Sequence, residues 1–370
     1  MRNSSWCVKH NHLDRSRRFV PYGCVMLSAV LLASCSQTST ATVTLSSSNS
    51  IQANYARIVS RYSTANNQAN ETLSVAKQNN DEQGTAAAID NADFYLSRDA
   101  GYQTAQGATY KPFYERLDHA VAIGASQKYP KLLLTVDAQY TTAPQTANRS
   151  ACRFLGIFAK DSPSAPWRVT DEPTVTKALL PEVKTTNGNR GITPATTAAL
   201  SIPLSRLAKY YALALTTYYQ QGVLSRGLKS ADFQTSAPCW SLPRLATNPY
   251  VSPSSSQQLA TSATVTAPHP AMVALSTANA GALTIFTLHV DLITSSPRST
   301  TFTWRHSATN PDSFLLPASS GLHNIQIPLL FNLAVYDPPV ADTTVAPRVI
   351  GSYWGPLLGG IETHKAPLDT

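Results

Sequence analysis

The stretch that decides the fold is Ala-Leu-Thr-Ile-Phe-Thr-Leu-His-Val-Asp-Leu-Ile, residues 282–293. From position 286 to 292 every even position is apolar, whereas Thr287, His289 and Asp291 occupy the odd positions. Successive side chains of a strand point to opposite faces, so this period of two predicts a β-strand with one buried and one wet face. Such a strand is typical of an antiparallel sheet, because parallel strands are usually buried on both faces.

The surrounding sequence predicts an antiparallel meander. Ala278-Asn279-Ala280-Gly281 is the expected turn before the strand, and Pro338-Pro339 breaks the chain between the last two strands. The further strands that we expect in this half are 272–276, 301–305, 325–336 and 345–353.

A helix is predicted ahead of this meander. Ser201 can cap it, Pro203 suits its first turn, and Gly222 is a natural stop. The apolar residues of one helical face are Leu204, Leu207, Tyr211, Leu215 and Tyr218.

The N-terminal half has the same order of elements. Residues 51–73 place an apolar stripe on a long amphipathic helix, and residues 86–95 predict a shorter one. The strands that we expect to follow are 132–140, 152–159 and 167–170.

The predicted fold class is therefore α+β, with two domains that each pack an N-terminal helix on a curved antiparallel sheet. The N-terminal domain covers residues 51–180, a linker covers 181–200, and the C-terminal domain covers 201–370. This element order resembles the cystatin-like folds, particularly the nuclear-transport-factor-2-like superfamily. The resemblance implies a long helix lying in a strongly bent sheet in each domain.

A basic leader and a short apolar run open the chain. Arg17 and Arg18 precede the run 25–32, which is too short to span a bilayer. The run ends in Leu32-Ala33-Ser34-Cys35, which matches the lipobox of bacterial lipoproteins at all four positions. The resemblance implies that residues 1–34 are a signal peptide and that the Cys35 sulfur carries a diacylglyceryl group.

Lipidation predicts the location of the mature chain. Two acyl chains anchor a protein stably. We therefore expect the mature chain at the extracytoplasmic face of the cell membrane, with the membrane as a partner through the lipid on Cys35. Ten of the residues 36–50 are Ser or Thr, so the segment 35–50 is expected to be a flexible tether. The alternatives are an ordinary cleaved signal with a coincidental Cys and an uncleaved anchor. Ser16-Arg17-Arg18-Phe19 resembles the start of a twin-arginine export signal, so export by the Sec route or by the twin-arginine route remains open.

Charge narrows the choice of partners. The formal net charge is +8, and residues 1–34 contribute five basic side chains and one acidic side chain. Half of the positive charge therefore belongs to the leader, and the rest forms no basic cluster of the kind that binds nucleic acid. An envelope polymer or a protein partner remains open, and no nucleic-acid partner is expected.

Cysteine usage leaves one pair to consider. Cys7 and Cys24 lie in the leader, and Cys35 is the lipidation site, so Cys152 and Cys239 remain. Outside the cytoplasm these two residues can form a disulfide. The alternative is two separately buried thiols, since free Cys packs as a small hydrophobic residue.

Catalytic and metal motifs are missing from the sequence. It contains no His-Glu-x-x-His, no phosphate-binding glycine loop and no Gly-x-Ser-x-Gly, so no cofactor and no metal are expected. Ser74-Val75-Ala76-Lys77 matches Ser-x-x-Lys without its companion motif, which favours solvent-facing residues near a helix end. His289 and Asp291 share a strand face and could serve as acid and base in a pocket, or simply form an outward polar face.

These observations favour a membrane-anchored extracytoplasmic lipoprotein that acts as a binding or structural module of the cell envelope, without enzyme activity. The alternatives are a solute-binding lipoprotein of a transporter, or a small-molecule hydrolase or isomerase with a cystatin-like pocket. The chain also resembles uncharacterised actinobacterial cell-envelope lipoproteins, which imply the location but no activity. The segments that carry this resemblance are the lipobox, Asn66–Asn70, Phe154–Trp167, Val335–Pro339 and Val349–Tyr353.

Overall fold

The computed structural model describes residues 48–105, 112, 114–123, 128–140, 152–186, 191–192, 199–221, 239, 251–252, 260–267, 273–296, 300–306, 311–358 and 361–365. The leader, the lipobox residues Leu32, Ala33, Ser34 and Cys35, and nearly all of the tether lie outside these ranges. The predictions of a signal peptide and a lipid anchor therefore remain predictions.

Four α-helices are described. They are α1 (Ser48–Thr72), α2 (Val75–Asp81), α3 (Gly84–Asp99) and α4 (Leu204–Gln221). Two short 3₁₀ helices, η2 (Lys177–Leu179) and η7 (Pro311–Leu315), lie between strands.

The described strands belong to one sheet of fifteen. In the N-terminal half they are β1 (Tyr114–Ile123), β2 (Lys131–Tyr140), β3 (Cys152–Lys160), β4 (Arg168–Asp171), β5 (Thr174–Thr176), β6 (Thr185–Thr186) and β7 (Gly191–Ile192). In the C-terminal half they are β8 (Val251–Ser252), β9 (Ala260–Thr266), β10 (Val273–Ser276), β11 (Ala282–Ser295), β12 (Phe302–Trp304), β13 (Ser319–Asp337), β14 (Arg348–Pro356) and β15 (Glu362–Lys365).

The main path of the sheet runs β10-β11-β13-β14-β5-β3-β2-β1-β7-β6. Among the described strands, the pairs are antiparallel except for β1 with β7. The predicted class, α+β with an antiparallel sheet, is confirmed.

The two halves meet where β14 pairs with β5. Gly351 lies opposite Val175 there, and a Cβ on Gly351 would come within 2.5 Å of the Thr174 carbonyl oxygen. Only glycine allows the two backbones to approach so closely. The halves also touch at 181–200, since the Lys184 amide donates to the Ser276 carbonyl oxygen at 2.7 Å. Because one sheet runs through both halves, the strand pairing does not separate the two predicted domains. The division into two domains therefore remains a prediction.

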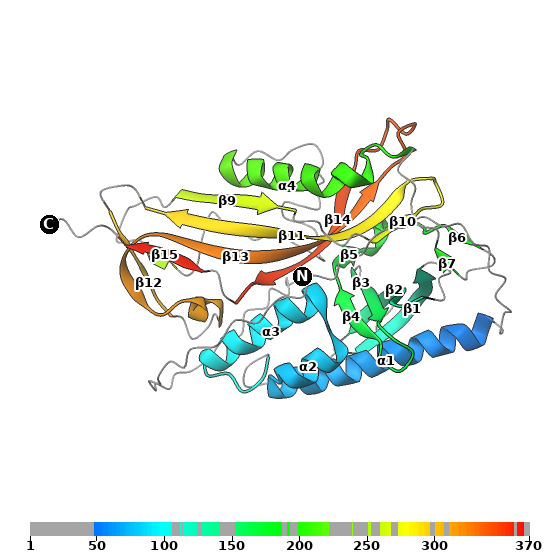
Figure 1. Cartoon of the computed structure of the whole chain (residues 1–370), viewed down its shortest axis with the longest axis horizontal. Helices are drawn as coiled ribbons and strands as arrows, with labels where there is room; N and C mark the ends of the chain where they lie inside the picture. Colours follow the sequence, from blue (N-terminus) through cyan, green and yellow to red (C-terminus); the bar gives the residue numbers. More distant parts are fainter. Residues whose placement is uncertain are drawn as a thin grey trace.

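Helices cover both faces of the C-terminal strands (Figure 1). On α4, the predicted apolar face is buried at Leu207, Tyr211 and Leu215 and packs in one core with Phe286 and Leu288 of β11. The opposite face is covered by α3, whose Thr85 hydroxyl lies 2.8 Å from that of Thr287. The period of two in 286–292 therefore separates an apolar layer under α4 from a more polar face, on which Thr287 meets α3.

The long helix α1 packs on the N-terminal strands. Val59 and Tyr62 are buried, and the Tyr62 ring meets Phe158 of β3 edge-on at 5.6 Å between centroids. Near the start of α1, Gln52 Nε2 donates to the Ala120 carbonyl oxygen of β1 at 3.0 Å. A helix over 51–73 was expected from the apolar stripe, and α1 confirms it.

The sequence did not predict α2. Leu73 adopts a positive φ of 49° and ends α1, and Ser74 then caps a new helix by accepting a hydrogen bond from the Lys77 amide at 3.4 Å. Ser74 and Lys77 are thus a helix start, which agrees with the non-catalytic interpretation of Ser-x-x-Lys. The second predicted helix, 86–95, is longer than expected and forms α3.

Candidate functional site

An open cleft of about 680 Å³ lies between the N-terminal strands and the segment that carries η2. Arg116, Asp118 and His119 come from β1, Val136 from β2 and Arg153 from β3. The opposite wall consists of Lys177, Leu180, Pro181, Glu182 and Val183. The cleft combines a partly apolar wall with several charged side chains, which is the composition expected of a site for a small polar ligand.

A β-bulge shapes one wall of the cleft. The register between β1 and β2 shifts between Leu117 and His119, so Asp118 is the extra residue. In a regular strand Asp118 and His119 would point to opposite faces, whereas both line the cleft. Bulges re-aim side chains in this way and are frequent next to functional sites.

The bulge brings Asp118 between two arginines. Arg153 Nε donates to Asp118 Oδ2 at 2.5 Å, and Arg116 Nη2 donates to Asp118 Oδ1 at 3.3 Å. The Arg153 side chain is only 2% exposed, whereas Arg116 is 37% exposed. The buried Arg153 guanidinium is a fixed base of the site, because it is held by its ion pair with the more exposed Asp118. Arg116 and the exposed Lys177 supply accessible positive charge above it.

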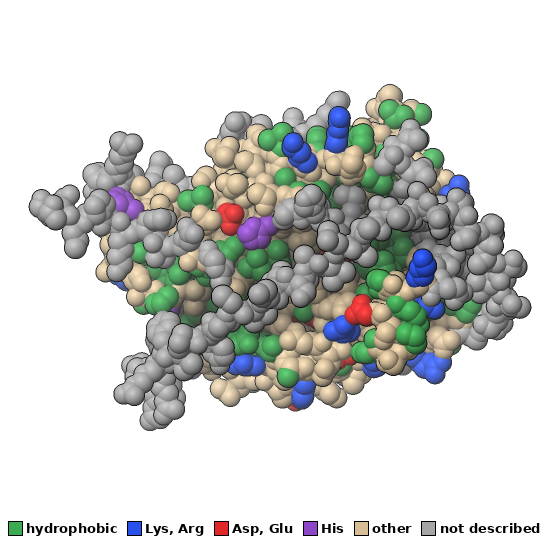
Figure 2. Space-filling model, viewed as in Figure 1, with side chains coloured by type: hydrophobic (Ala, Val, Ile, Leu, Met, Phe, Trp, Pro, Cys, Tyr) green, Lys and Arg blue, Asp and Glu red, His purple; other side chains and the backbone are tan. Residues whose placement is uncertain are grey.

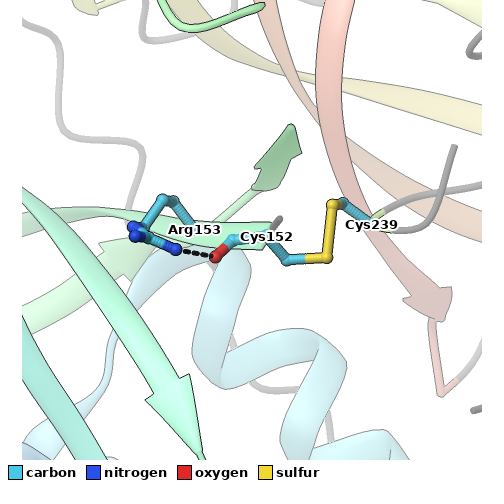
Figure 3. Close-up of a disulfide and its surroundings, with 3 residues drawn as sticks. All are labelled: Cys152, Arg153 and Cys239. Carbon is cyan, nitrogen blue, oxygen red and sulfur yellow. Dashed lines mark hydrogen bonds between the residues drawn. A yellow bond between two sulfur atoms is a disulfide. The ribbon is translucent and has the colours of Figure 1, made fainter. Parts of the chain in front are cut away.

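A disulfide lies at the end of the same strand. Cys152 of β3 is bonded to Cys239, and the two Cα atoms are 5.1 Å apart. Arg153 Nη1 donates to the Cys152 carbonyl oxygen at 2.7 Å, and the arginine and the disulfide extend in opposite directions from the strand (Figure 3). Cys239 packs against the core under α4, so the bond ties the C-terminal half to the strand that holds Arg153.

A second group of polar residues is buried beneath the helices. Glu82 between α2 and α3, Asp90 of α3 and Glu172 after β4 each offer a carboxylate oxygen within 4.8 Å of the others. Tyr62 joins them, with its hydroxyl oxygen 2.8 Å from Glu82 Oε1 and 2.9 Å from Glu172 Oε2. Tyr353 of β14 donates to Asp90 Oδ1, so the group also reaches the C-terminal half. Oxygen donors of this kind are the ligands of hard divalent cations.

Burial strongly favours the neutral forms of these carboxyls. Desolvation raises the pKa of Glu172 to about 8 and that of Asp90 to about 6. It also raises the pKa of Glu82 well above its usual range, and the charges of Asp90 and Glu172 raise it further. Three uncompensated buried charges are costly, so a proton or a cation at these carboxyls stabilises the folded chain.

The predicted acid–base pair lies elsewhere. His289 and Asp291 share one face of β11 as expected, with Nδ1 and Oδ2 3.9 Å apart and side chains that are 31% and 23% exposed. Neither residue lines the cleft between β1 and η2. The arrangement is a partly exposed polar pair.

Sequence reasoning missed both the cleft and the carboxyl group. The three carboxyls come from positions 82, 90 and 172, a spacing that matches no local motif. Arg116 and Asp118 stood in a strand that the sequence did not predict, and the bulge that turns Asp118 toward Arg153 leaves no compositional trace. The only available signal was the pair Cys152 and Cys239, of which Cys152 marks the start of β3.

Charge on the surface is dispersed. On the face shown in Figure 2, the Lys and Arg side chains of the described residues are spread over several elements and do not form a single patch. No helix within the described ranges is both long enough and apolar enough to cross a membrane.

The fold and the cleft define an α+β protein built on one largely antiparallel sheet with helices on both faces. The chain belongs to the family described as "Domain of unknown function (DUF8094)", whose model matches residues 51–352. The match begins in α1 and ends in β14, so the family unit includes both halves and the cleft. Comparisons with curated proteins and with solved structures found no match.

Proposed function

We propose that this chain is a lipid-anchored, extracytoplasmic module of the cell envelope that binds a small ligand with an anionic group in the cleft between β1 and η2. The observation that carries the proposal is the charge layout of that cleft. The buried Arg153, ion-paired with the more exposed Asp118, forms its base, and the more accessible Arg116 and Lys177 face a ligand from two walls. Arginine suits this role because its guanidinium binds carboxylate and phosphate groups in two-point geometry.

The disulfide supports the extracytoplasmic location. Disulfides persist in oxidising compartments and are rare in the cytosol of ordinary cells. Cys152 and Cys239 are bonded across 87 positions of sequence, which agrees with a chain that folds after export. The lipobox that ends in Cys35 supports the same location independently, from the sequence.

We also infer that residues 51–180 and 201–370 are two units with a common plan, joined at the β14–β5 pair. The helix α1 packs on β1, and α4 packs on β9 and β11, so each half has one helix against antiparallel strands. We include in this inference a cystatin-like bend in the part of the sheet that each half contributes.

The structural observations weigh differently on the two alternatives. A solute-binding protein of a transporter is usually built from strand–helix–strand units with parallel strands, whereas the described strands here pair antiparallel apart from β1 with β7. A hydrolase or isomerase would need His289 and Asp291 in a pocket, and they lie partly exposed on β11. The binding module is therefore the function that the geometry supports best.

The anchor is tested by metabolic labelling with a palmitate analogue in bacteria that express the full chain. We expect label on the wild type and none on Cys35→Ala, with Cys152→Ala as the matched cysteine control that keeps the label. Equal labelling of the wild type and Cys35→Ala would refute the anchor.

Ligand binding is tested with the full chain purified in detergent, by a thermal-shift screen of small carboxylates and phosphate esters. We expect at least one compound to raise the melting temperature of the wild type but not of Arg116→Glu or Lys177→Glu. Lys160→Glu at the end of β3 is the control, because Lys160 does not line the cleft. Equal shifts in the cleft variants and the control would argue against this site.

A further inference from the structure

The buried carboxyl group lies where the three N-terminal helices meet the sheet (Figure 1). Glu82 follows α2, Asp90 belongs to α3, and Glu172 follows β4. Glu82 and Glu172 are buried, whereas Asp90 is partly exposed. The group therefore lies largely out of solvent, between the helices and the sheet.

Two acceptor atoms in this group have no hydrogen-bond donor. Gln78 is only 1% exposed, and its Nε2 donates to Asp90 Oδ2 at 2.9 Å, so its amide lies against the carboxyls. The carbonyl oxygen of that same amide is buried without a partner, and so is Oε2 of Glu82. Buried hydrogen-bond acceptors normally have a donor. These two oxygens therefore indicate a place for an electron-pair acceptor such as a metal cation.

The donors that are present do not balance the acceptors. Tyr62 has one hydroxyl proton but lies within hydrogen-bond distance of both Glu82 Oε1 and Glu172 Oε2. Its oxygen already accepts a hydrogen bond from Asn66 Nδ2 at 2.9 Å. The tyrosine can therefore donate to only one of the two carboxylates, which leaves the other in need of a proton or a cation.

We propose that Glu82, Asp90 and Glu172, together with the Gln78 carbonyl oxygen, form a binding site for a hard divalent cation, and that Ca²⁺ is the preferred ion. All four ligands are oxygens, which favours Ca²⁺ or Mg²⁺ over ions that prefer nitrogen or sulfur. Carboxylate oxygens within 4.8 Å of one another can share a Ca²⁺ ion, since Ca–O distances are about 2.3–2.6 Å. Ca²⁺ is favoured over Mg²⁺ because it tolerates an irregular ligand set drawn from separate elements.

The ion has a structural role in this assignment. Its ligands come from α2, α3 and the segment after β4, while Tyr353 of β14 donates to Asp90 from the C-terminal half. A bound cation would therefore hold the helices against the sheet at the junction of the two halves. This role is independent of the cleft and of the lipid anchor.

The first test measures Ca²⁺ binding by the full chain in detergent after removal of ions with EDTA. We expect isothermal titration to give one site, and added Ca²⁺ to raise the melting temperature. Glu82→Gln and Glu172→Gln should each weaken Ca²⁺ binding at least about tenfold. Glu182→Gln, an exposed glutamate of the cleft, should bind Ca²⁺ as the wild type does.

The second test locates the ion and does not depend on the carboxyl variants folding. Tb³⁺ occupies Ca²⁺ sites, and tyrosines in contact with its ligands sensitise its luminescence. We expect Tyr-sensitised luminescence from the wild type, its displacement by Ca²⁺, and a clear loss in the double variant Tyr62→Phe/Tyr353→Phe, because both tyrosines contact the carboxyl ligands. Tyr95→Phe removes an exposed tyrosine on the same helix as Asp90 and should change little.

The outcomes separate a cation site from shared protons. The assignment is overturned if Ca²⁺ neither binds nor raises the melting temperature, and stabilisation of the chain by Glu82→Gln and Glu172→Gln would then show that protonated carboxyls fill the group. It is also overturned if Tb³⁺ luminescence is equal in Tyr62→Phe/Tyr353→Phe and the wild type. Tighter binding of Mg²⁺ than of Ca²⁺ would refute the stated preference.

Discussion

Asn332 on β13 donates a hydrogen bond of 2.6 Å to Oδ1 of Asp171 on β4, although the two residues are 161 positions apart. Asn332 Nδ2 also lies 3.1 Å from the Thr287 hydroxyl of β11, which in turn meets Thr85 of α3. One aspartate thus connects strands of the C-terminal half with β4 of the N-terminal half. This polar link, together with the β14–β5 pair, explains why the two halves form one sheet.

We predict that Asp171→Ala destabilises the protein by about 1–3 kcal/mol, because Asn332 loses its buried acceptor. The measurement is urea unfolding followed by circular dichroism. Asp161→Ala is the matched control, since Asp161 forms only a surface ion pair with Arg168 and should change stability by less than about 1 kcal/mol. Equal effects of the two variants would contradict the link.

Loss of the disulfide should destabilise the chain more strongly. Cys152 and Cys239 are 87 positions apart, and a loop of this length corresponds to about 4.6 kcal/mol in the chain-entropy account of cross-links. We expect a lower melting temperature in the double variant Cys152→Ser/Cys239→Ser, and a similar decrease when the wild type is reduced. Dithiothreitol should leave the double variant unaffected. A wild type that is equally stable with and without reductant would contradict this prediction.

Local patterns predicted the elements, but contacts across the sheet decided how they assemble. The strand 282–293 was recognisable because apolar and polar residues alternate over its second half, and α1 and α4 because their apolar faces repeat every three to four residues. β13 is longer than expected because Ser319 to Asn324 are mostly polar, and pairing with β12 and β15 makes them a strand. That pairing depends on partners far away in the sequence.

The candidate sites were less predictable than the fold. Asp118 turns toward Arg153 only because of a bulge, and Glu82, Asp90 and Glu172 meet only because α2 and α3 fold back on β4. Each residue taken alone has the sequence context of a surface carboxylate. The cysteine pair was recognisable because counting cysteines needs no geometry.

Gly355 should tolerate no side chain beside α3. A Cβ at this position of β14 would lie 2.5 Å from Cγ2 of Ile89. We predict that Gly355→Ala lowers the free energy of unfolding by about 1–3 kcal/mol through overpacking. In an Ile89→Ala background the same change should cost clearly less, because the clashing methyl group is gone. An unchanged penalty in that background would show that the contact with Ile89 is not its cause.

Asp137 should make the stability depend on pH. It is buried on β2 with Thr135 as a hydrogen-bond donor, and burial, together with the charge of Asp118, raises its pKa to about 8. An unfolded aspartate has a pKa of about 3.9, so the folded state binds the extra proton between about pH 4 and pH 8. The stabilisation from this residue is therefore complete below about pH 4 and is lost as the pH rises through 8.

We expect the free energy of unfolding in EDTA to fall between pH 5 and pH 8, and Asp137→Asn to make this fall shallower by up to about 1.4 kcal/mol per pH unit. Asparagine keeps the shape of the protonated carboxyl without titrating, so the variant should be clearly more stable than the wild type at pH 8, less so at pH 5, and nearly equal to it below about pH 4. Asp161→Asn, at an exposed position, should keep the slope of the wild type. Parallel pH profiles for wild type and Asp137→Asn would contradict this prediction. They would mean that Asp137 is ionised in the folded protein and that groups other than Thr135 compensate its charge.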